Sequence, residues 1–80
     1  MSKPKVLSGQ DAVRIFEQFG FAIFSQKGSH IKMRRELGGL RQTLTIPNHK
    51  ELDKGTTTSL FRQASVYISQ SELHPHFYND

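Results

Sequence analysis

The fold is decided by the stretch SHIKMRRELGGLRQTLTI, residues 29–46. Apolar and basic residues alternate at its start. The apolar residues are Ile31 and Met33, and the basic residues are His30, Lys32 and Arg34. Successive side chains of a β-strand point to opposite faces of a sheet. The alternation therefore predicts a half-buried strand over 29–34 with a basic outer face.

A neighbouring strand is expected over 40–46, after a glycine-containing turn at 36–39. Its apolar residues fall on one face, with Gln42 as the odd member. The other face is polar and carries Arg41, Thr43 and Thr45. Pro47 ends the strand, because proline cannot donate to a strand ladder.

A third strand is expected upstream, over the aromatic and branched stretch FAIFS at 21–25. A turn at 26–28 joins it to the strand over 29–34, with Gly28 free to adopt a left-handed conformation. Three consecutive strands joined by tight turns form an antiparallel meander. Phe16, Phe21 and Phe24 are expected in the core rather than as surfaces for stacking bases.

Helices are expected on both sides of the meander. Ser8 and Asp11 have the spacing of a capping box, and apolar residues then recur at helical spacing over 9–19 until Gly20 ends the helix. A second helix is expected over 57–64, after a threonine run that offers N-caps. A short third helix is expected over 69–74, with Pro75 ending it.

The fold class that follows is α+β, a two-layer sandwich with the order α-β-β-β-α(-α). An amphipathic antiparallel three-stranded sheet must cover its apolar face, and the helices are the cover available, so they are expected on one face. A chain of 80 residues makes a single domain over 1–80. The tails at 1–7 and 76–80 are expected to be flexible.

Charge points to the class of partner. The chain has 11 Lys and Arg against 7 Asp and Glu, and six of the basic residues lie between Gln26 and Lys50 against Glu36 alone. Such a stretch suits a polyanion such as nucleic acid, although a solvated face that aids solubility has the same composition. The absence of cysteine excludes disulfides and a thiol nucleophile. No apolar run approaches the roughly 20 residues of a membrane span, and the start does not resemble a signal peptide.

His30 is the strongest candidate for a catalytic residue. Imidazole titrates near neutral pH and serves as a general acid or base. RNA carries its own nucleophile, the 2′-hydroxyl, so its cleavage needs a base, an acid and donors that steady the charge on phosphate. Lys27, Lys32 and the backbone N–H groups of the Gly28 turn are placed to act as such donors. The alternative interpretation is an exposed strand histidine with no special role.

Other polar residues have weaker claims. Ser29 is either a donor to phosphate or a cap of the turn, and His49 is either close to the same surface or loop filler. A helix start at Thr56 or Thr57 offers N–H groups to a phosphate, although plain capping is the favoured explanation of those threonines. His74 and His76 are too few ligands for a zinc site, so neither a metal nor a cofactor is expected.

The chain resembles the HicA family, the toxins of HicA–HicB toxin–antitoxin systems. The resemblance covers about 8–73 and rests on five blocks in this order: FGF at 19–21, QKGSH at 26–30, IPNH at 46–49, KGT at 54–56 and FRQA at 61–64. It implies a fold like that of a double-stranded RNA-binding domain. It also implies ribosome-independent cleavage of messenger RNA, with His30 at the position of the catalytic histidine. At Thr58 the chain lacks a basic residue that the family often has.

The sequence therefore predicts a metal-independent endoribonuclease toxin with His30 as general acid or base. The residues expected to contact RNA are Lys27, Gly28, Ser29, Lys32, Arg34, Arg41 and His49. The resemblance further implies a HicB antitoxin that covers the RNA-binding face in a hetero-oligomer and supplies operator-DNA binding. The expected location is the cytoplasm of a bacterium or archaeon, with no membrane partner. The alternatives are a non-catalytic RNA-binding module of the same fold and a structural interaction subunit.

Overall fold

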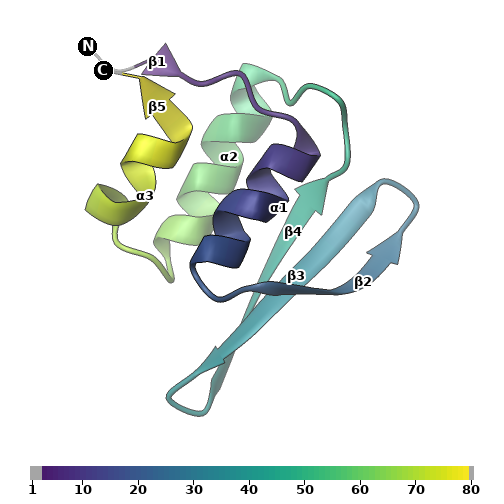
Figure 1. Cartoon of the computed structure of the whole chain (residues 1–80), viewed down its shortest axis with the longest axis vertical. Helices are drawn as coiled ribbons and strands as arrows, with labels where there is room; N and C mark the ends of the chain where they lie inside the picture. Colours follow the sequence, from purple (N-terminus) through teal and green to yellow (C-terminus); the bar gives the residue numbers. More distant parts are fainter. Residues whose placement is uncertain (1–2, 80) are drawn as a thin grey trace.

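The computed structural model describes residues 3–79 and has an α+β fold (Figure 1). The elements in chain order are β1 (Lys3–Pro4), α1 (Gly9–Gln18), β2 (Ala22–Lys27), β3 (His30–Leu37), β4 (Leu40–Pro47), α2 (Lys54–Ser65), α3 (Gln70–Phe77) and β5 (Tyr78–Asn79). Strands β2, β3 and β4 form a three-stranded antiparallel sheet in that spatial order. The predicted fold class is confirmed, and so is the order of elements, which is like that of a double-stranded RNA-binding domain.

The two faces of the sheet differ as the alternation of residues predicts. The inner face, against which the helices lie, carries four fully buried side chains: Ile31, Met33, Leu44 and Ile46 (Figure 1). These join a single core with apolar residues of all three helices and of the loops before α1 and α2. The outer face carries the intervening polar residues, of which Lys32 and Thr43 are exposed. One sheet face thus holds the fold together and the other remains open.

The β3–β4 hairpin is longer than the alternation of residues indicates. Glu36 and Leu37 continue β3, and only Gly38 and Gly39 form the turn. Both glycines have positive φ, +59° and +78°, which a two-residue turn of type I′ requires at its two central positions. The hairpin projects beyond the helices (Figure 1), so Leu37 and Leu40 stay exposed near its tip.

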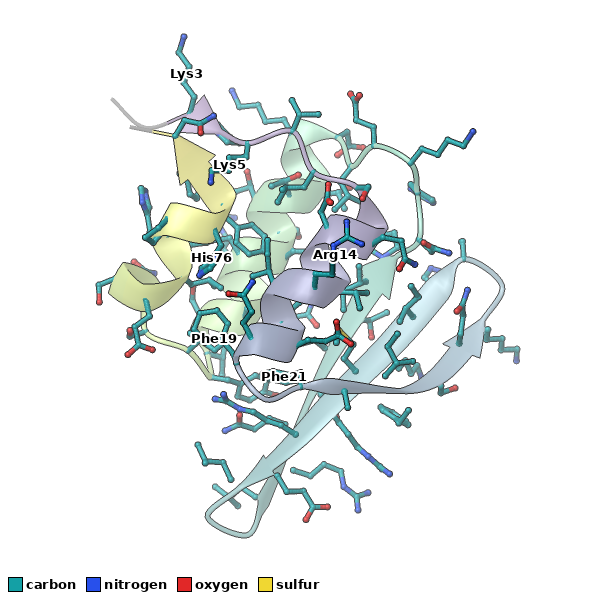
Figure 2. The ribbon with its side chains drawn as sticks, in the orientation of Figure 1. Lys3, Lys5, Arg14, Phe19, Phe21 and His76 are labelled. Carbon is teal, nitrogen blue, oxygen red and sulfur yellow. The ribbon has the colours of Figure 1, made fainter. Side chains whose placement is uncertain are left out.

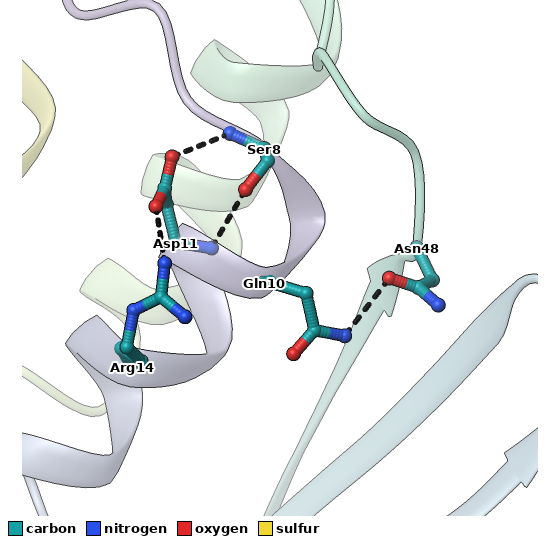
Figure 3. Close-up of polar contacts among 5 residues, drawn as sticks. All are labelled: Ser8, Gln10, Asp11, Arg14 and Asn48. Atoms are coloured by element: carbon teal, nitrogen blue, oxygen red, sulfur yellow. Dashed lines mark hydrogen bonds and ion pairs between the residues drawn. The ribbon is translucent and has the colours of Figure 1, made fainter.

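Helix α1 begins with the capping box that the sequence predicts. The Asp11 N–H donates to Ser8 Oγ at 2.9 Å, and the Ser8 N–H donates to Asp11 Oδ2 at 2.9 Å (Figure 3). Arg14 adds a bond from Nη2 to Asp11 Oδ1 at 2.6 Å. Accepting the Ser8 N–H, and next the Arg14 bond, lowers the pKa of Asp11 below its ordinary value.

Helix α2 begins three residues earlier than predicted. Its N-cap is Asp53 rather than a threonine, and Asp53 Oδ1 accepts the Thr56 N–H at 2.7 Å. Thr57 is buried, and its hydroxyl donates to the Asp53 carbonyl at 3.1 Å. The Thr56 bond is the main cause that lowers the pKa of Asp53. Because a carboxylate already occupies this helix end, plain capping explains the threonines better than a phosphate site does.

Acid is expected to destabilise the fold through these two caps. Because the pKa values of Asp11 and Asp53 are lowered in the folded state, their stabilisation is fully present above the ordinary aspartate pKa, about 3.9. It is lost as the pH falls below that value toward the folded-state pKa values. Thermal unfolding between pH 6 and pH 2 is the measurement. The double variant Asp11→Asn, Asp53→Asn should show a shallower fall in Tm than the parent chain, and an equally steep fall would contradict the assignment.

Helix α3 runs through Pro75, which the sequence analysis expected to end it. Proline lacks the N–H that an interior helical position donates. The burial of the next turn offsets this loss, because Phe77 is fully buried and its ring lies 5.7 Å from that of Phe16 and 5.8 Å from that of Phe61. The helix ends at Tyr78, whose N–H donates to the His74 carbonyl.

The two ends of the chain are paired with each other within the described residues, in the ranges 1–7 and 76–80 where flexible tails were expected. Lys3–Pro4 and Tyr78–Asn79 form an antiparallel two-stranded ladder, and the Lys5 N–H donates to the Phe77 carbonyl at 2.8 Å. Leu7 is buried in the core. Apolar anchors next to each end hold the tails in place. Residues 1, 2 and 80, which the same expectation included, lie outside the described residues.

Arg35 belongs to the basic stretch of the sequence but faces inward. Its Nη1 donates to the Phe19 carbonyl at 2.6 Å, its Nη2 to the Tyr67 carbonyl at 3.0 Å and its Nε to Gln42 Oε1 at 2.6 Å. The guanidinium also lies 4.8 Å from the centroid of the Phe21 ring. One side chain thus joins the sheet, the end of α1 and the connection between α2 and α3.

Replacing Arg35 with alanine is expected to destabilise the fold by about 2 kcal/mol, because it leaves two partly buried carbonyls without a donor. In a domain of this size that corresponds to a Tm about 10 °C lower. Arg41→Ala is the matched control. Arg41 pairs with Glu36 at 3.6 Å on an exposed part of the hairpin, so its loss should change Tm little. Equal effects of the two substitutions in thermal unfolding would contradict the role given to Arg35.

Candidate functional site

The turn between β2 and β3 presents His30. Lys27 and His30 are paired across the two strands, with only Gly28 and Ser29 between them. Gly28 has φ +58°, and no residue other than glycine has positive φ among those described. Positive φ at the first central position only is the pattern of a type II′ turn, which favours glycine there. His30 is therefore the first residue of β3, and its side chain is exposed.

A row of basic groups follows from His30 along the outer face of β3. His30 lies in register with Lys27 and Pro47, and Lys32 with Ser25 and Thr45. Alternate residues of one strand are about 7 Å apart on the same face. The imidazole thus stands at one end of a basic row that continues through Lys32 to Arg34.

The segment 47–49, at the end of β4, is hydrogen-bonded beside the His30 turn. The Asn48 N–H donates to the Ser29 carbonyl at 2.6 Å, and the Gly9 N–H donates to the His49 carbonyl at 2.8 Å. Gln10 Nε2 donates to Asn48 Oδ1 at 3.0 Å (Figure 3). The start of α1 and the turn therefore hold the backbone of the segment from both sides. This arrangement places the backbone of Asn48 beside the turn that carries His30, with His49 as the next residue.

The side chain of His49 is exposed and lies close enough to Asp53 to affect it. The bond from Thr56 is the main cause that lowers the pKa of Asp53, and the charge of His49 adds to it. His49 therefore lies between the His30 turn and the start of α2.

The other residues expected to contact RNA lie at different distances from His30. Lys27, Gly28, Ser29 and Lys32 are exposed and lie beside or next to His30 in the sheet. Arg41 is set apart, because it pairs with Glu36 about 20 Å further along β3. Arg34 lies between them and is partly buried.

Phe24, expected in the core, is the main surprise at this face. The residue is 43% exposed, and the Arg34 guanidinium carbon lies 4.5 Å from the ring centroid. The helices cover the opposite side of β3, where Met33 is buried. A stacked pair of an aromatic ring and a guanidinium therefore lies beside the basic row.

A groove borders the site and was not foreseen. It has a volume of about 470 Å³ and separates β4 from the first half of α2; its lining is Thr45, Pro47, Asp53, Gly55, Thr56, Ser59, Leu60 and Gln63. Gln63 Oε1 accepts the Thr45 N–H at 3.0 Å at its floor. Pro47, which lines the groove, is the register partner of His30, and His30 itself is not part of the lining. The polar residues of α2 are the only sign of this groove in the sequence.

Metal ligands are not gathered in the described part of the chain, where no group of three or more His, Cys, Asp or Glu side chains is placed to hold an ion. The two histidines of α3 pack against aromatic rings instead. The His74 ring stacks on Tyr78 at 4.7 Å, and the His76 ring meets the edge of Phe19 at 5.4 Å (Figure 2). Within residues 3–79 no helix combines the length and apolar character that crossing a bilayer requires.

Comparison with known protein families finds a match. A family model described as the HicA toxin of bacterial toxin–antitoxin systems matches residues 9–66, which include α1, the three-stranded sheet and α2. The matched range also contains the His30 turn and the segment of His49. No curated protein and no solved structure matches the chain.

Proposed function

The chain belongs to the HicA toxin family, and we propose on that basis that it is an endoribonuclease that cleaves messenger RNA with His30 as its general acid–base group. The observation that carries the proposal is the exposed imidazole of His30, which stands at the end of a basic row on the outer face of the sheet. An exposed imidazole can reach a polymer that lies across the sheet. Family membership supports the toxin role, and the geometry supports the residue.

The proposed reaction uses the nucleophile of the substrate. His30 takes the proton of an RNA 2′-hydroxyl, whose oxygen attacks the adjacent phosphorus while the bond to the 5′-oxygen breaks and that oxygen receives a proton. The products are a 2′,3′-cyclic phosphate and a 5′-hydroxyl. Lys27, Lys32 and the backbone N–H groups of the Gly28–Ser29 turn are proposed to steady the negative charge on the phosphoryl oxygens. His49 is the nearest candidate for a second proton-transfer group.

The other proposed RNA contacts extend this surface. Arg34 and Arg41 lie further along the hairpin and would bind the backbone away from the cleaved bond. Because acid–base chemistry on a 2′-hydroxyl needs no metal ion, the cleavage is proposed to be metal-independent and to require no cofactor. Messenger RNA as substrate places the activity in the cytoplasm.

The proposed partner is a HicB-type antitoxin that covers the outer face and His30 in a hetero-oligomer. Covering this face would block RNA and mask the positive charge at the same time. Contact with operator DNA is then made by the antitoxin and not by this chain. A basic face of this kind favours a partner that presents acidic groups to it.

Incubation of purified protein with messenger RNA in the presence of EDTA is the direct test. The proposal expects defined cleavage products with cyclic phosphate ends, and growth arrest on expression that a co-expressed antitoxin relieves. Salt-dependent binding with RNA that stays intact would favour the non-catalytic RNA-binding module instead. Activity that EDTA abolishes would overturn the metal-independent mechanism.

A further inference from the structure

The side chain of Phe24 lies on the outer face of the sheet because it follows Ile23, whose register partner is the inward-facing Met33. Ile23 is in register with Met33, yet Ser25 is in register with Lys32, so two steps along β2 correspond to one step along β3. Phe24 is the extra residue of this β-bulge. Bulges near functional sites commonly re-aim a side chain. Here the shift places Ser25 on the outer face beside Phe24, and the Phe24 ring lies against Arg34, away from the core that its apolar character would favour.

The position of the ring sets it apart from the other exposed apolar side chains. Ile23 is exposed to a similar extent, 45%, but shares its register with the inward-facing Met33. Phe24 contacts Arg34, which belongs to the same face of β3 as His30 and Lys32. An aromatic ring next to a guanidinium and amid backbone-binding cations is the combination with which proteins hold single-stranded nucleic acid.

We propose that Phe24 and Arg34 form a stacking site for one unpaired base of the RNA substrate. The inference rests on the function proposed above and adds a substrate class to it, namely RNA that is single-stranded where it crosses β2. Bases within a duplex are already stacked on their neighbours and cannot splay onto a protein ring, whereas unpaired bases can. The fold resembles a module that reads duplex shape, so this site makes a prediction that the fold alone does not.

The stacking site is separate from the cleavage site. Arg34 follows His30 by four residues on β3, which places the two about 13 Å apart along the strand. A base held there belongs to a nucleotide beyond the cleaved bond. The site therefore positions the strand and does not take part in proton transfer, and Phe24 is a binding residue rather than a catalytic one.

The test compares binding of single-stranded and duplex oligoribonucleotides of one sequence, in the His30→Ala background so that the RNA stays intact. Phe24→Ala is expected to weaken binding of the single strand about 10-fold and to leave duplex binding unchanged. Phe24→Trp should retain the binding of the parent. Ile23→Ala is the matched control, since it removes an equally exposed side chain from the adjacent position on β2.

The outcomes separate this inference from the proposed function. Equal single-strand binding by Phe24→Ala and its parent, or an equal loss for single strand and duplex, overturns the stacking site while leaving RNA as the substrate. A parent protein that binds neither RNA overturns the proposed function and the inference with it. Because Phe24 is exposed, Phe24→Ala should keep the circular dichroism spectrum of the parent, and Phe24→Trp tests the ring itself should Phe24→Ala fail to fold.

Discussion

Replacing His30 with alanine is expected to slow RNA cleavage by about 10²–10⁴-fold, the range that a positioned acid–base group contributes. The side chain is exposed, so the loss of its packing should change stability by no more than about 0.5 kcal/mol. Binding of RNA should persist, because Lys27 and Lys32 remain in place. The measurement is the rate of cleavage at saturating protein, read beside thermal unfolding of the same preparation.

Two further histidine variants sharpen the result. His76→Ala is the matched control, since that ring packs on Phe19 away from the sheet face and should leave the cleavage rate unchanged for folded protein. His49→Ala tests the second proton-transfer group, and a fall comparable to that of His30→Ala would identify it. Wild-type cleavage by His30→Ala would refute the assignment of the general acid–base group to His30.

The faces of the sheet were predictable because apolar and basic residues alternate from His30 to Arg34. Ile31 and Met33 are both fully buried, as their positions required. The expectation that Phe24 lies in the core was wrong because it rested on the apolar character of the residue alone, whereas Phe24 follows the inward-facing Ile23 and so points to the other face. The register of β2 against β3 decides that side chain, and pairing of this kind is a property of two strands rather than one.

Arg35 and Pro75 show a second limit of local reasoning. The sequence shows Arg35 only as one of the cations of the basic stretch, because the three acceptors that it satisfies come from separate parts of the chain. The end of α3 was predicted too early from Pro75. The helix continues to Phe77, which is fully buried. Tertiary contacts outweigh local propensity in both cases.

The candidate site, like the fold, could be predicted from the sequence only where the signals are local. Gly28 and the strand alternation located the His30 turn, since both signals are local. The groove beside α2 and the bonds that fasten 47–49 to the start of α1 join segments that are distant in sequence. Gly9 in particular reads in the sequence as an unremarkable first residue of a helix.

Gly9→Ala is expected to destabilise the fold by about 3 kcal/mol, the upper part of the range for overpacking. A Cβ at this position would overlap the Pro47 carbonyl oxygen and lie 2.8 Å from the Asn48 Cα. Backbone atoms cannot rotate away as a flexible side chain can, so α1 and the segment must separate. That separation also strains the bond from the Gly9 N–H to the His49 carbonyl. Tm should fall by at least about 10 °C.

Gly55→Ala distinguishes this steric cause from a general effect of glycine replacement. Gly55 lies in the first turn of α2, where a Cβ would meet only Asp53 Oδ1 at an ordinary 3.6 Å. Alanine favours helix more than glycine does, so Gly55→Ala should be neutral or slightly stabilising. Because Gly9 holds the segment beside the His30 turn, Gly9→Ala should also lower the cleavage rate at temperatures where the variant is still folded. A Gly9→Ala protein with the stability of the parent would show that the segment tolerates displacement, and the close approach would then have no part in positioning His49.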